Sequence, residues 1–232
     1  MTDVPRPAVR TGAWREAIVR SVSHPNEHAV VLRLQVPDRI AHLPGQHYVI
    51  RLTAPDGYVA QRSYSIASAP SDDLLEFYIE RLPHGEVSSF LSDIVDVGDV
   101  LDVRGPIGGW FVWDASTPML GVAGGSGVVP FIAMLRHARE AGRLDLLRLA
   151  VSARTENDVP YAAELNSIGA LVRLTRAGDG RLTPQDLAPL VPGARDFFVC
   201  GAPAFTSAAV SWLQVLGAPT EAIRIESFGP SG

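Results

Sequence analysis

Apolar and polar residues alternate in short runs along the first half of the chain, as they do in strands that bury one face. Clusters of proline, glycine, asparagine and aspartate separate these runs and predict tight turns. One stretch with a helical pattern, residues 88–94, interrupts the series. The expected strands cover residues 14–22, 29–36, 47–52, 62–65, 74–81 and 100–103. Many short strands with regular turns are typical of an antiparallel barrel.

The second half of the chain changes to short apolar strands that alternate with helical patterns. The expected strands are residues 119–123, 146–152, 170–175, 196–200 and 223–228. The expected helices are residues 129–140, 160–168, 184–190 and 204–216. This alternation predicts a parallel sheet with helices on both faces. The pattern changes near residues 114–118, so we expect one domain over residues 1–114 and a second over residues 115–232.

The composition excludes several kinds of chemistry. The 232 residues carry 20 basic and 25 acidic side chains, a net charge of −5, and every basic residue is arginine. A chain without lysine has no Schiff-base, Walker-type or kinase lysine, and mild acidity argues against nucleic acid as a partner. Cys200 is the single cysteine. An internal disulfide, a cysteine-ligated iron–sulfur cluster and an all-cysteine zinc site are therefore excluded, and we expect no metal site.

No segment has the pattern of a signal peptide or of a membrane span. Residues 1–13 include charged side chains and lack an apolar core. Two long uncharged runs, residues 115–135 and 197–220, are interrupted by glycine and proline. Each fits a strand, a turn and the start of a helix better than a membrane helix. We therefore expect a cytoplasmic protein with no membrane partner, and a monomer.

A glycine-rich turn, Gly-Gly-Ser-Gly-Val-Val-Pro at residues 124–130, follows an apolar strand and opens a helix. Glycine lets the backbone approach a phosphate closely, and the free N–H groups of a helix start attract anions. Pro130 suits the first helical turn, where a missing N–H costs nothing. The spacing differs from the usual dinucleotide fingerprint, so a plain strand-to-helix turn without a ligand is the alternative.

Two further segments have polar residues in positions that suit a ligand. Residues 62–65, Arg-Ser-Tyr-Ser, lie along an expected strand, where the first and third side chains share a face. Residues 85–88, Gly-Glu-Val-Ser, form a second glycine turn before a helix. Taken singly, these segments have ordinary explanations: a polar strand edge, and a helix cap by Ser88.

The order of the motifs is more informative than any one of them. After the segments at 62–65 and 85–88 come Gly-Pro-Ile-Gly at 105–108 and the glycine turn; Cys-Gly at 200–201 and Glu-Ser-Phe at 226–228 end the series. This ordered set resembles the ferredoxin–NADP reductase superfamily of flavoproteins, over about residues 14–228. The resemblance implies an antiparallel six-stranded Greek-key FAD-binding barrel, followed by a parallel α/β domain that binds NAD(P).

The resemblance assigns a group of residues to the flavin. It implies that Arg62 neutralises the flavin pyrophosphate, as the guanidinium fork is suited to do. It also implies that the Tyr64 ring packs on the isoalloxazine and that Ser65 forms a hydrogen bond near flavin N5. The other residues it assigns to the flavin nucleotide are Ser63, Ile79, Arg81, Gly85, Val87 and Ser88.

A second group is assigned to the nicotinamide side of the site. The residues that would line the nucleotide channel are Gly125, Ser126, Gly127, Cys200 and Gly201. Cys200 would lie close to the nicotinamide, although a buried cysteine in a core strand is an equal alternative. Glu226 and Phe228 match the family's terminal Glu-x-aromatic, and Phe228 would cover the second flavin face until nicotinamide displaces it. The chain departs from the plant-type pattern because four residues follow Phe228, and this tail is expected to reach the adenosine of the flavin.

Arginine after the second strand of the α/β domain bears on the choice of coenzyme. NADPH requires cations for its 2′-phosphate, and the candidates are Ser152, Arg154, Arg176 and Arg181. Surface ion pairs are the alternative for these arginines. The pattern favours NADPH over NADH.

The implied function is an FAD-dependent NAD(P)H reductase. Hydride passes from nicotinamide C4 to flavin N5, and the cofactors carry the chemistry while the protein orients them. Ser65, Cys200, Glu226 and Phe228 tune and position the reacting groups. The acceptor would be a separate protein: a ferredoxin, a flavodoxin or an oxygenase component. Two alternatives stay open: a flavin reductase or diaphorase that uses free flavin, and a flavin-binding subunit without turnover.

Overall fold

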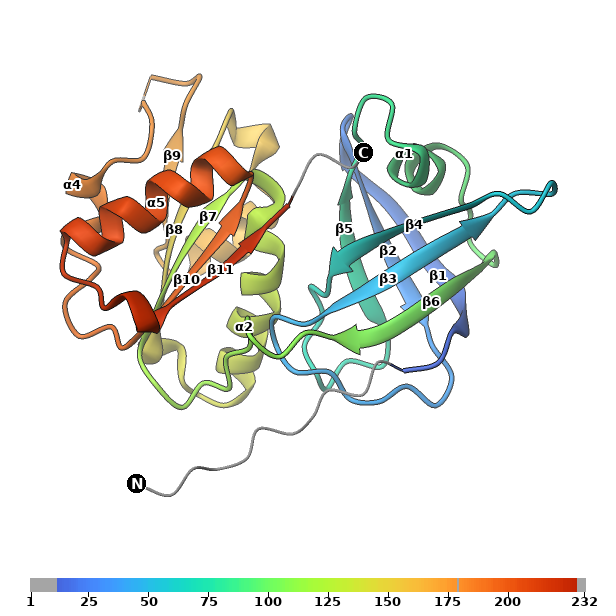
Figure 1. The fold of residues 1–232 in the computed structure, drawn as a ribbon, viewed down its shortest axis with the longest axis horizontal. Helices are drawn as coiled ribbons and strands as arrows, with labels where there is room; N and C mark the ends of the chain where they lie inside the picture. The colour runs from blue at the N-terminus through green and yellow to red at the C-terminus, as the bar shows by residue number, and fades with distance from the viewer. Residues whose placement is uncertain (1–11, 179, 229–232) are drawn as a thin grey trace.

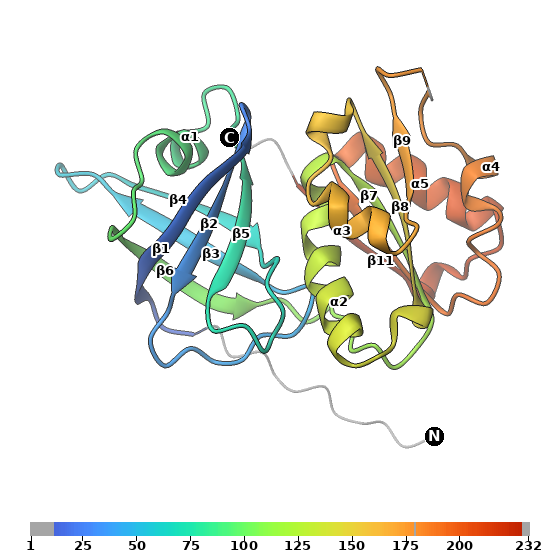
Figure 2. The same cartoon turned by 180° about the vertical axis from the view of Figure 1, so that it is seen from behind.

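The computed structural model describes residues 12–178 and 180–228. They form two lobes side by side, a β-barrel and an α/β domain (Figures 1 and 2). The chain builds the barrel first and enters the α/β domain through the segment between residues 107 and 119.

The barrel is one antiparallel sheet of six strands with a single short helix. Its elements are β1 (Arg15–Asn26), β2 (Ala29–Gln35), β3 (His47–Thr53), β4 (Val59–Ser65), β5 (Leu75–Glu80), α1 (Glu86–Asp93) and β6 (Val100–Ile107). The strand order is β4-β3-β6-β1-β2-β5. The two end strands, β4 and β5, contact each other and bring the sheet round on itself. Alternate apolar residues such as Leu32, Ile50 and Phe77 fill its interior.

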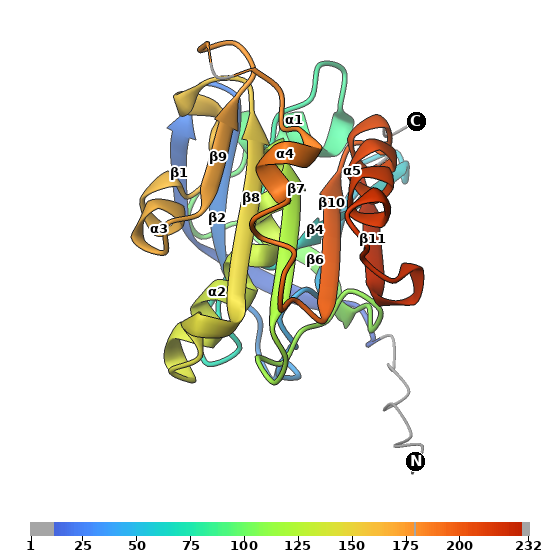
Figure 3. The same ribbon diagram turned by 90° about the vertical axis from the view of Figure 1, so that its left-hand side faces the viewer.

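The α/β domain is a parallel sheet of five strands between two layers of helices. Its elements are β7 (Met119–Gly124), α2 (Val129–Glu140), β8 (Leu147–Ala153), α3 (Ala162–Ser167), β9 (Leu171–Leu174), α4 (Pro184–Leu187), β10 (Asp196–Gly201), α5 (Pro203–Val215) and β11 (Ile223–Ser227). The strand order is β11-β10-β7-β8-β9. Helices α4 and α5 cover one face and α2 and α3 cover the other (Figure 3). Neighbouring residues of β7 therefore pack in different layers, Val122 on the α5 side and Ala123 on the α2 side.

These observations confirm the predicted fold class, with small differences at element ends. The third helix begins at Ala162 instead of residue 160, because Tyr161 has a left-handed backbone (φ 55°). The helix before β6 begins at Glu86, with Gly85 as its N-cap. Ser88 is therefore inside the first turn, and the expectation that it caps the helix is wrong.

The two lobes are joined by a buried polar contact as well as by apolar packing. Arg136 of α2 donates to the carbonyl of Ala67 (3.0 Å) and to Glu76 Oε1 of β5 (2.9 Å). Tyr161 donates its hydroxyl to the same oxygen (3.0 Å). This network fixes the α/β domain against the barrel at β5 and at the segment that follows β4.

The helices in residues 12–178 and 180–228 all fall short of the length and apolar character needed to cross a bilayer.

Candidate active site

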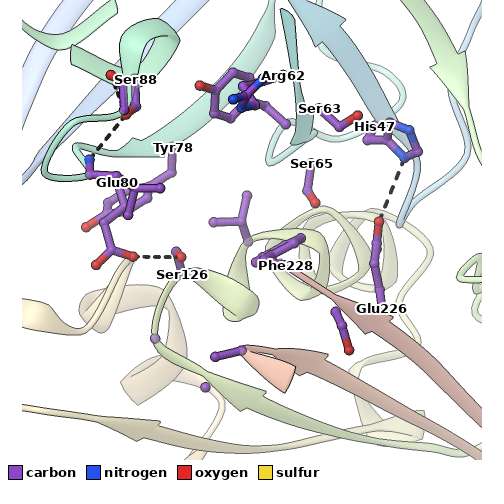
Figure 4. Close-up of a pocket in the computed structure, with 18 of the residues that line it drawn as sticks. His47, Arg62, Ser63, Ser65, Tyr78, Glu80, Ser88, Ser126, Glu226 and Phe228 are labelled. Carbon is purple, nitrogen blue, oxygen red and sulfur yellow. Dashed lines mark hydrogen bonds and ion pairs between the residues drawn. The ribbon is translucent and has the colours of Figure 1, made fainter. Parts of the chain in front are cut away.

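A cleft of about 860 Å³ lies between the barrel and the α/β domain. The barrel supplies one wall through β3, β4, β5 and the start of α1, and the α/β domain supplies the other (Figure 4). The lining residues are His47, Arg62, Ser63, Tyr64, Ser65, Tyr78, Glu80, Leu82, Gly85, Val87, Ser88, Gly124, Gly125, Ser126, Val129, Arg154, Ala202, Pro203, Phe205, Glu226, Ser227 and Phe228.

The end of β4 brings a hydroxyl into the middle of this cleft. Ser65 is the last residue of β4 and is 6% exposed, and its buried Oγ has no hydrogen-bond partner within the described structure. Figure 4 shows this hydroxyl pointing into the cavity toward Phe228. A buried hydroxyl without a partner is costly in a folded protein, so this group is suited to a ligand that fills the cleft.

The neighbouring strand residues add an aromatic ring and a cation. Tyr64 is half-buried at the edge of the barrel core, and burial raises the pKa of its phenol, which stays neutral. Arg62 lines the cleft two residues earlier and donates to the carbonyl of Gln61 (2.7 Å). The strand thus presents a guanidinium, a ring and a hydroxyl in sequence.

Glu226 of β11 faces His47 of β3 across the cleft. The two groups lie 3.8 Å apart, Nδ1 to Oε1, and the second carboxylate oxygen of Glu226 is buried without a partner. Burial raises the pKa of Glu226 to about 7, and burial lowers the pKa of His47 below its usual value. Near neutral pH this corner of the cleft therefore holds a carboxyl group that gains and loses a proton readily.

The glycine-rich turn forms the floor of the cleft on the α/β side. Residues 125–128 make a 3₁₀ turn that leads directly into α2, and Gly125 has a left-handed backbone (φ 56°). A Cβ on Gly127 would lie 2.4 Å from the carbonyl oxygen of Cys200, so the turn packs directly on β10. Ser126 donates its hydroxyl to Glu80 Oε2 of the barrel (2.9 Å).

The start of α1 closes the far end of the cleft. Ser88 is buried; its Oγ accepts from the Leu82 amide (3.2 Å) and donates to the Gly85 carbonyl (3.3 Å). Tyr58, from the β3–β4 turn, donates its hydroxyl to Glu86 Oε2 (2.9 Å). These bonds hold the turn before α1 in place, with its glycine facing the cavity.

Many of the residues expected from sequence come together here, and others do not. The expected residues that line the cleft are Arg62, Ser63, Tyr64, Ser65, Gly85, Val87, Ser88, Gly125, Ser126, Arg154, Glu226 and Phe228. The expected residues outside its lining are Ile79, Arg81, Gly127, Ser152, Arg176, Arg181, Cys200 and Gly201. The tail after Phe228 and the first eleven residues lie outside the described part of the chain.

Strand alternation explains the position of Ile79 and Arg81. The Ile79 side chain is fully buried in the barrel core, and Arg81 forms an exposed ion pair with Asp93 (2.9 Å). Because side chains alternate between faces, the residues of β5 that face the cleft are Tyr78 and Glu80. The wrong face of this strand was therefore assigned to the flavin from the sequence, with Ile79 and Arg81 in place of Tyr78 and Glu80.

Cys200 lies behind the cleft wall, in the core of the α/β domain. Its side chain is fully buried and opposes Glu226 in the pairing of β10 with β11. Burial raises the pKa of its thiol well above the usual range, and the nearby charge of Glu226 raises this pKa further. The thiol therefore stays protonated and acts as a small packing group in this structure.

The lining residues that the sequence did not assign to the site include His47, Tyr78 and Glu80. His47 pairs with Ser65 in the β3–β4 ladder, which places the two side chains on one face. No local motif marks any of the three. They could have been found by working out which side chains of β3 and β5 share a face with the 62–65 segment.

The cleft suits a flavin nucleotide in three respects. Its volume is in the range of cofactor sites. The unpartnered Ser65 hydroxyl offers a hydrogen bond where a ring system would lie between Tyr64 and Phe228. Gly85 and Gly125 present backbone without side chains at the two ends where phosphates would approach. The residues present therefore fit FAD on the barrel side and a nicotinamide nucleotide on the α/β side.

Known proteins agree with this assignment. Residues 18–112 match the family model described as an oxidoreductase FAD-binding domain. The chain is 32% identical over 218 residues to the ferredoxin–NAD(P)(+) reductase component of the naphthalene 1,2-dioxygenase/salicylate 5-hydroxylase systems of Ralstonia sp, covering 87% of this chain and 65% of that protein. It is 26% identical over 234 residues to the toluate 1,2-dioxygenase electron transfer component of Pseudomonas putida, covering 94% and 69%. The chain thus spans about two thirds of the length of these relatives.

Solved structures share the fold over almost the whole chain. The ferredoxin NADP+ reductase of Neisseria gonorrhoeae, solved with bound FAD and NADP, has a TM-score of 0.80 at 19% identity, covering 92% of this chain and 98% of that one. The FAD/NAD-binding domain of the Vibrio cholerae nitric oxide dioxygenase has a TM-score of 0.82 at 23% identity, covering 95% and 100%. The family match and the named relatives identify the class of protein, an FAD-dependent NAD(P)H oxidoreductase. Over most of its length the chain is similar to ferredoxin–NAD(P)(+) reductase components of oxygenase systems, and it shares the fold of a ferredoxin NADP+ reductase.

Proposed function

We propose that this protein passes electrons from NADPH, through bound FAD, to a separate redox protein such as a ferredoxin, a flavodoxin or an oxygenase component. One observation carries the proposal: the buried, unpartnered Ser65 hydroxyl lies in a cleft between Tyr64, Phe228 and the glycine-rich turn. The relatives named above are reductase or electron-transfer components of oxygenase systems, which supports an acceptor on another chain.

The chain's own residues bind and orient the reactants in this proposal. FAD, when bound, supplies a ring that accepts hydride from the nicotinamide and releases electrons singly or in pairs. Arg62 neutralises pyrophosphate charge, and the amides of the turn before α1 donate to it. Ser65 donates a hydrogen bond to the ring, and Phe228 covers it against water. The Glu226 carboxyl group, with a pKa of about 7, holds or releases a proton beside the ring.

The other expected residues act indirectly. Gly127 and Gly201 let the glycine-rich turn and β10 approach each other closely. Ser63 and Val87 shape the barrel wall. Cys200 packs in the core of the α/β domain and Ile79 in the core of the barrel, behind the two walls of the cleft. Arg81 holds α1 in place through its ion pair with Asp93.

Arginines at the carboxyl ends of β8 and β9 support NADPH as the coenzyme. The Arg176 amide donates to the Arg154 carbonyl (2.9 Å), which places the two residues side by side. Arg176 and Arg181 are both exposed. Ser152 lies at the end of β8 beside them. A KM for NADH as low as that for NADPH would overturn this assignment.

Three further parts of the proposal come from the sequence. We divide the chain at 114/115, place the protein in the cytoplasm and expect a monomer. Cell fractionation tests the location, and sedimentation tests the oligomeric state.

The decisive experiment supplies the purified protein with NADPH and one of two acceptors, a [2Fe–2S] ferredoxin or free riboflavin. The proposal expects a protein that retains FAD and reduces ferredoxin faster than riboflavin. A colourless protein that reduces only added flavin would establish a flavin reductase instead. Bound flavin that NADPH leaves oxidised would establish a subunit without turnover.

A further inference from the structure

Glu80 connects two groups of the α/β domain that face the nucleotide side of the cleft. One carboxylate oxygen accepts from the Ser126 hydroxyl (2.9 Å), and the other accepts from Arg154 Nη2 (3.3 Å). Glu80 belongs to β5 of the barrel, whereas its two partners belong to the glycine-rich turn and to the end of β8. Figure 4 shows the bond between Glu80 and Ser126 crossing the cleft.

The charges around Arg154 are unfavourable for an incoming anion. Asp158 lies 3.6 Å from the same Arg154 nitrogen, so two carboxylates surround one guanidinium. Asp158 also caps its own turn through Thr155, which holds it in place without Arg154. Glu80 has no such second function, and its side chain is 34% exposed, so it is free to leave.

We propose that Glu80 is a specificity-determining residue, which competes with the phosphates of the nicotinamide nucleotide for Ser126 and Arg154. The inference rests on the proposed function, because it takes a 2′-phosphorylated adenine nucleotide as the ligand. When such a nucleotide binds, a phosphate replaces the Glu80 carboxylate at the guanidinium. Glu80 then sets the affinity of this position for the 2′-phosphate.

The competition is expected to lower the affinity of the protein for the phosphate. A carboxylate that must leave Arg154 lowers the affinity for the entering phosphate, and a carboxylate that stays nearby repels it. Both effects disappear when Glu80 becomes a neutral amide of the same shape. The effect is largest for a ligand that uses Arg154, because Ser126 contributes a weaker, uncharged hydrogen bond.

The test measures binding of 2′,5′-ADP and 5′-AMP to the FAD-loaded protein by titration calorimetry. Glu80→Gln is expected to bind 2′,5′-ADP about three- to tenfold more tightly, with less than a twofold change for 5′-AMP. Glu80→Asp keeps the charge on a shorter arm that cannot reach both partners, so a smaller gain is expected. Glu156→Gln removes the same charge from an exposed position two residues from Arg154 and is expected to leave both affinities unchanged.

A double-mutant cycle isolates the contact itself. In an Arg154→Gln background, Glu80→Gln is expected to lose its effect on 2′,5′-ADP. Unchanged or weaker binding of 2′,5′-ADP by Glu80→Gln overturns the inference and leaves the coenzyme assignment in place. If the wild-type protein binds 2′,5′-ADP no better than 5′-AMP, the NADPH assignment and the inference both fail.

Discussion

Glu226 carries a largely buried carboxyl group whose Oε2 lacks a hydrogen-bond partner within the described residues, and this has a measurable cost. Burial raises its pKa from 4.5 to about 7, so the folded state holds a proton that the unfolded state releases between these values. Stability contributed by this group is therefore complete below pH 4.5 and is lost as the pH rises to 7. The shift corresponds to about 3 kcal/mol.

Glu226→Gln is expected to raise the free energy of unfolding by about 2–3 kcal/mol at pH 8 and to leave it nearly unchanged at pH 4. Urea denaturation at the two pH values measures the difference. Glu221→Gln, at an exposed position in the turn just before β11, is the control and should show neither change. An equal effect of Glu226→Gln at both pH values would contradict the account. Replacing a residue that is retained for function often makes a protein more stable, as expected here for Glu226→Gln.

Ser65→Ala removes the hydroxyl that has no partner in the structure. We expect FAD content to be unchanged, because other contacts hold the nucleotide, and flavin reduction by NADPH to slow by at least about tenfold. Stopped-flow absorbance measures the rate. Ser211→Ala on α5 is a matched hydroxyl deletion far from the cleft. Reduction at the wild-type rate by Ser65→Ala would refute its role.

At this scale the sequence predicted the residues of the 62–65 and 226–228 segments that meet in the cleft. It failed where a side chain's direction decides the outcome. Ile79 and Arg81 lie one position from the cleft-facing Tyr78 and Glu80, because a strand exposes every second residue. Cys200 shares its strand register with Glu226, and only the structure shows that its thiol faces the core.

At the scale of elements, the glycine-rich turn offers a direct comparison between two glycines with different functions. A Cβ on Gly127 would lie 2.4 Å from the Cys200 oxygen and 2.6 Å from its carbonyl carbon, and backbone atoms cannot rotate away. A Cβ on Gly125 would meet no atom within 4 Å, although its φ of 56° strains other residues.

Gly127→Ala is expected to lower the free energy of unfolding by about 3 kcal/mol through overpacking. Gly125→Ala is expected to cost about 1 kcal/mol, from backbone strain alone. Urea denaturation of the two variants measures both values. The reverse order would show that the turn is arranged differently.

Most elements could be predicted because their patterns are local. Alternating residues marked the strands, and Pro130 marked the start of α2. The ends were less certain where one backbone angle decides them, as at Tyr161, or where a glycine replaces a side-chain cap, as at Gly85. The pairing of β4 with β3, which places His47 beside Ser65, is a long-range contact that no local pattern specifies.

At the scale of the whole molecule, the cleft exists only if the two lobes keep their arrangement. Glu76 is 8% exposed and accepts hydrogen bonds from Arg136 and Tyr161 of the other lobe. It also forms ion pairs with Arg136 (2.9 Å) and Arg33 (3.4 Å), and Arg136 has a second acidic partner in Glu164 (2.7 Å). Glu140, by contrast, accepts from Ser71 at an exposed contact between the same lobes.

Glu76→Gln is expected to lower the free energy of unfolding by about 3 kcal/mol, because it leaves a partly buried guanidinium with less compensation. Glu140→Gln is expected to cost less than about 1 kcal/mol. Calorimetry of both variants measures the difference and shows whether the lobes still unfold together. Equal, small losses would mean that apolar packing alone holds the lobes.

The central claim is that a flavin bound between Tyr64 and Phe228 receives electrons from a nicotinamide nucleotide bound on the α/β side. Anaerobic titration of the purified protein with NADPH, followed by its visible absorbance spectrum, tests this most directly. The account predicts a yellow protein whose flavin absorbance disappears as one equivalent of NADPH is added. A purified protein that contains no flavin and takes up none when FAD is supplied would contradict it.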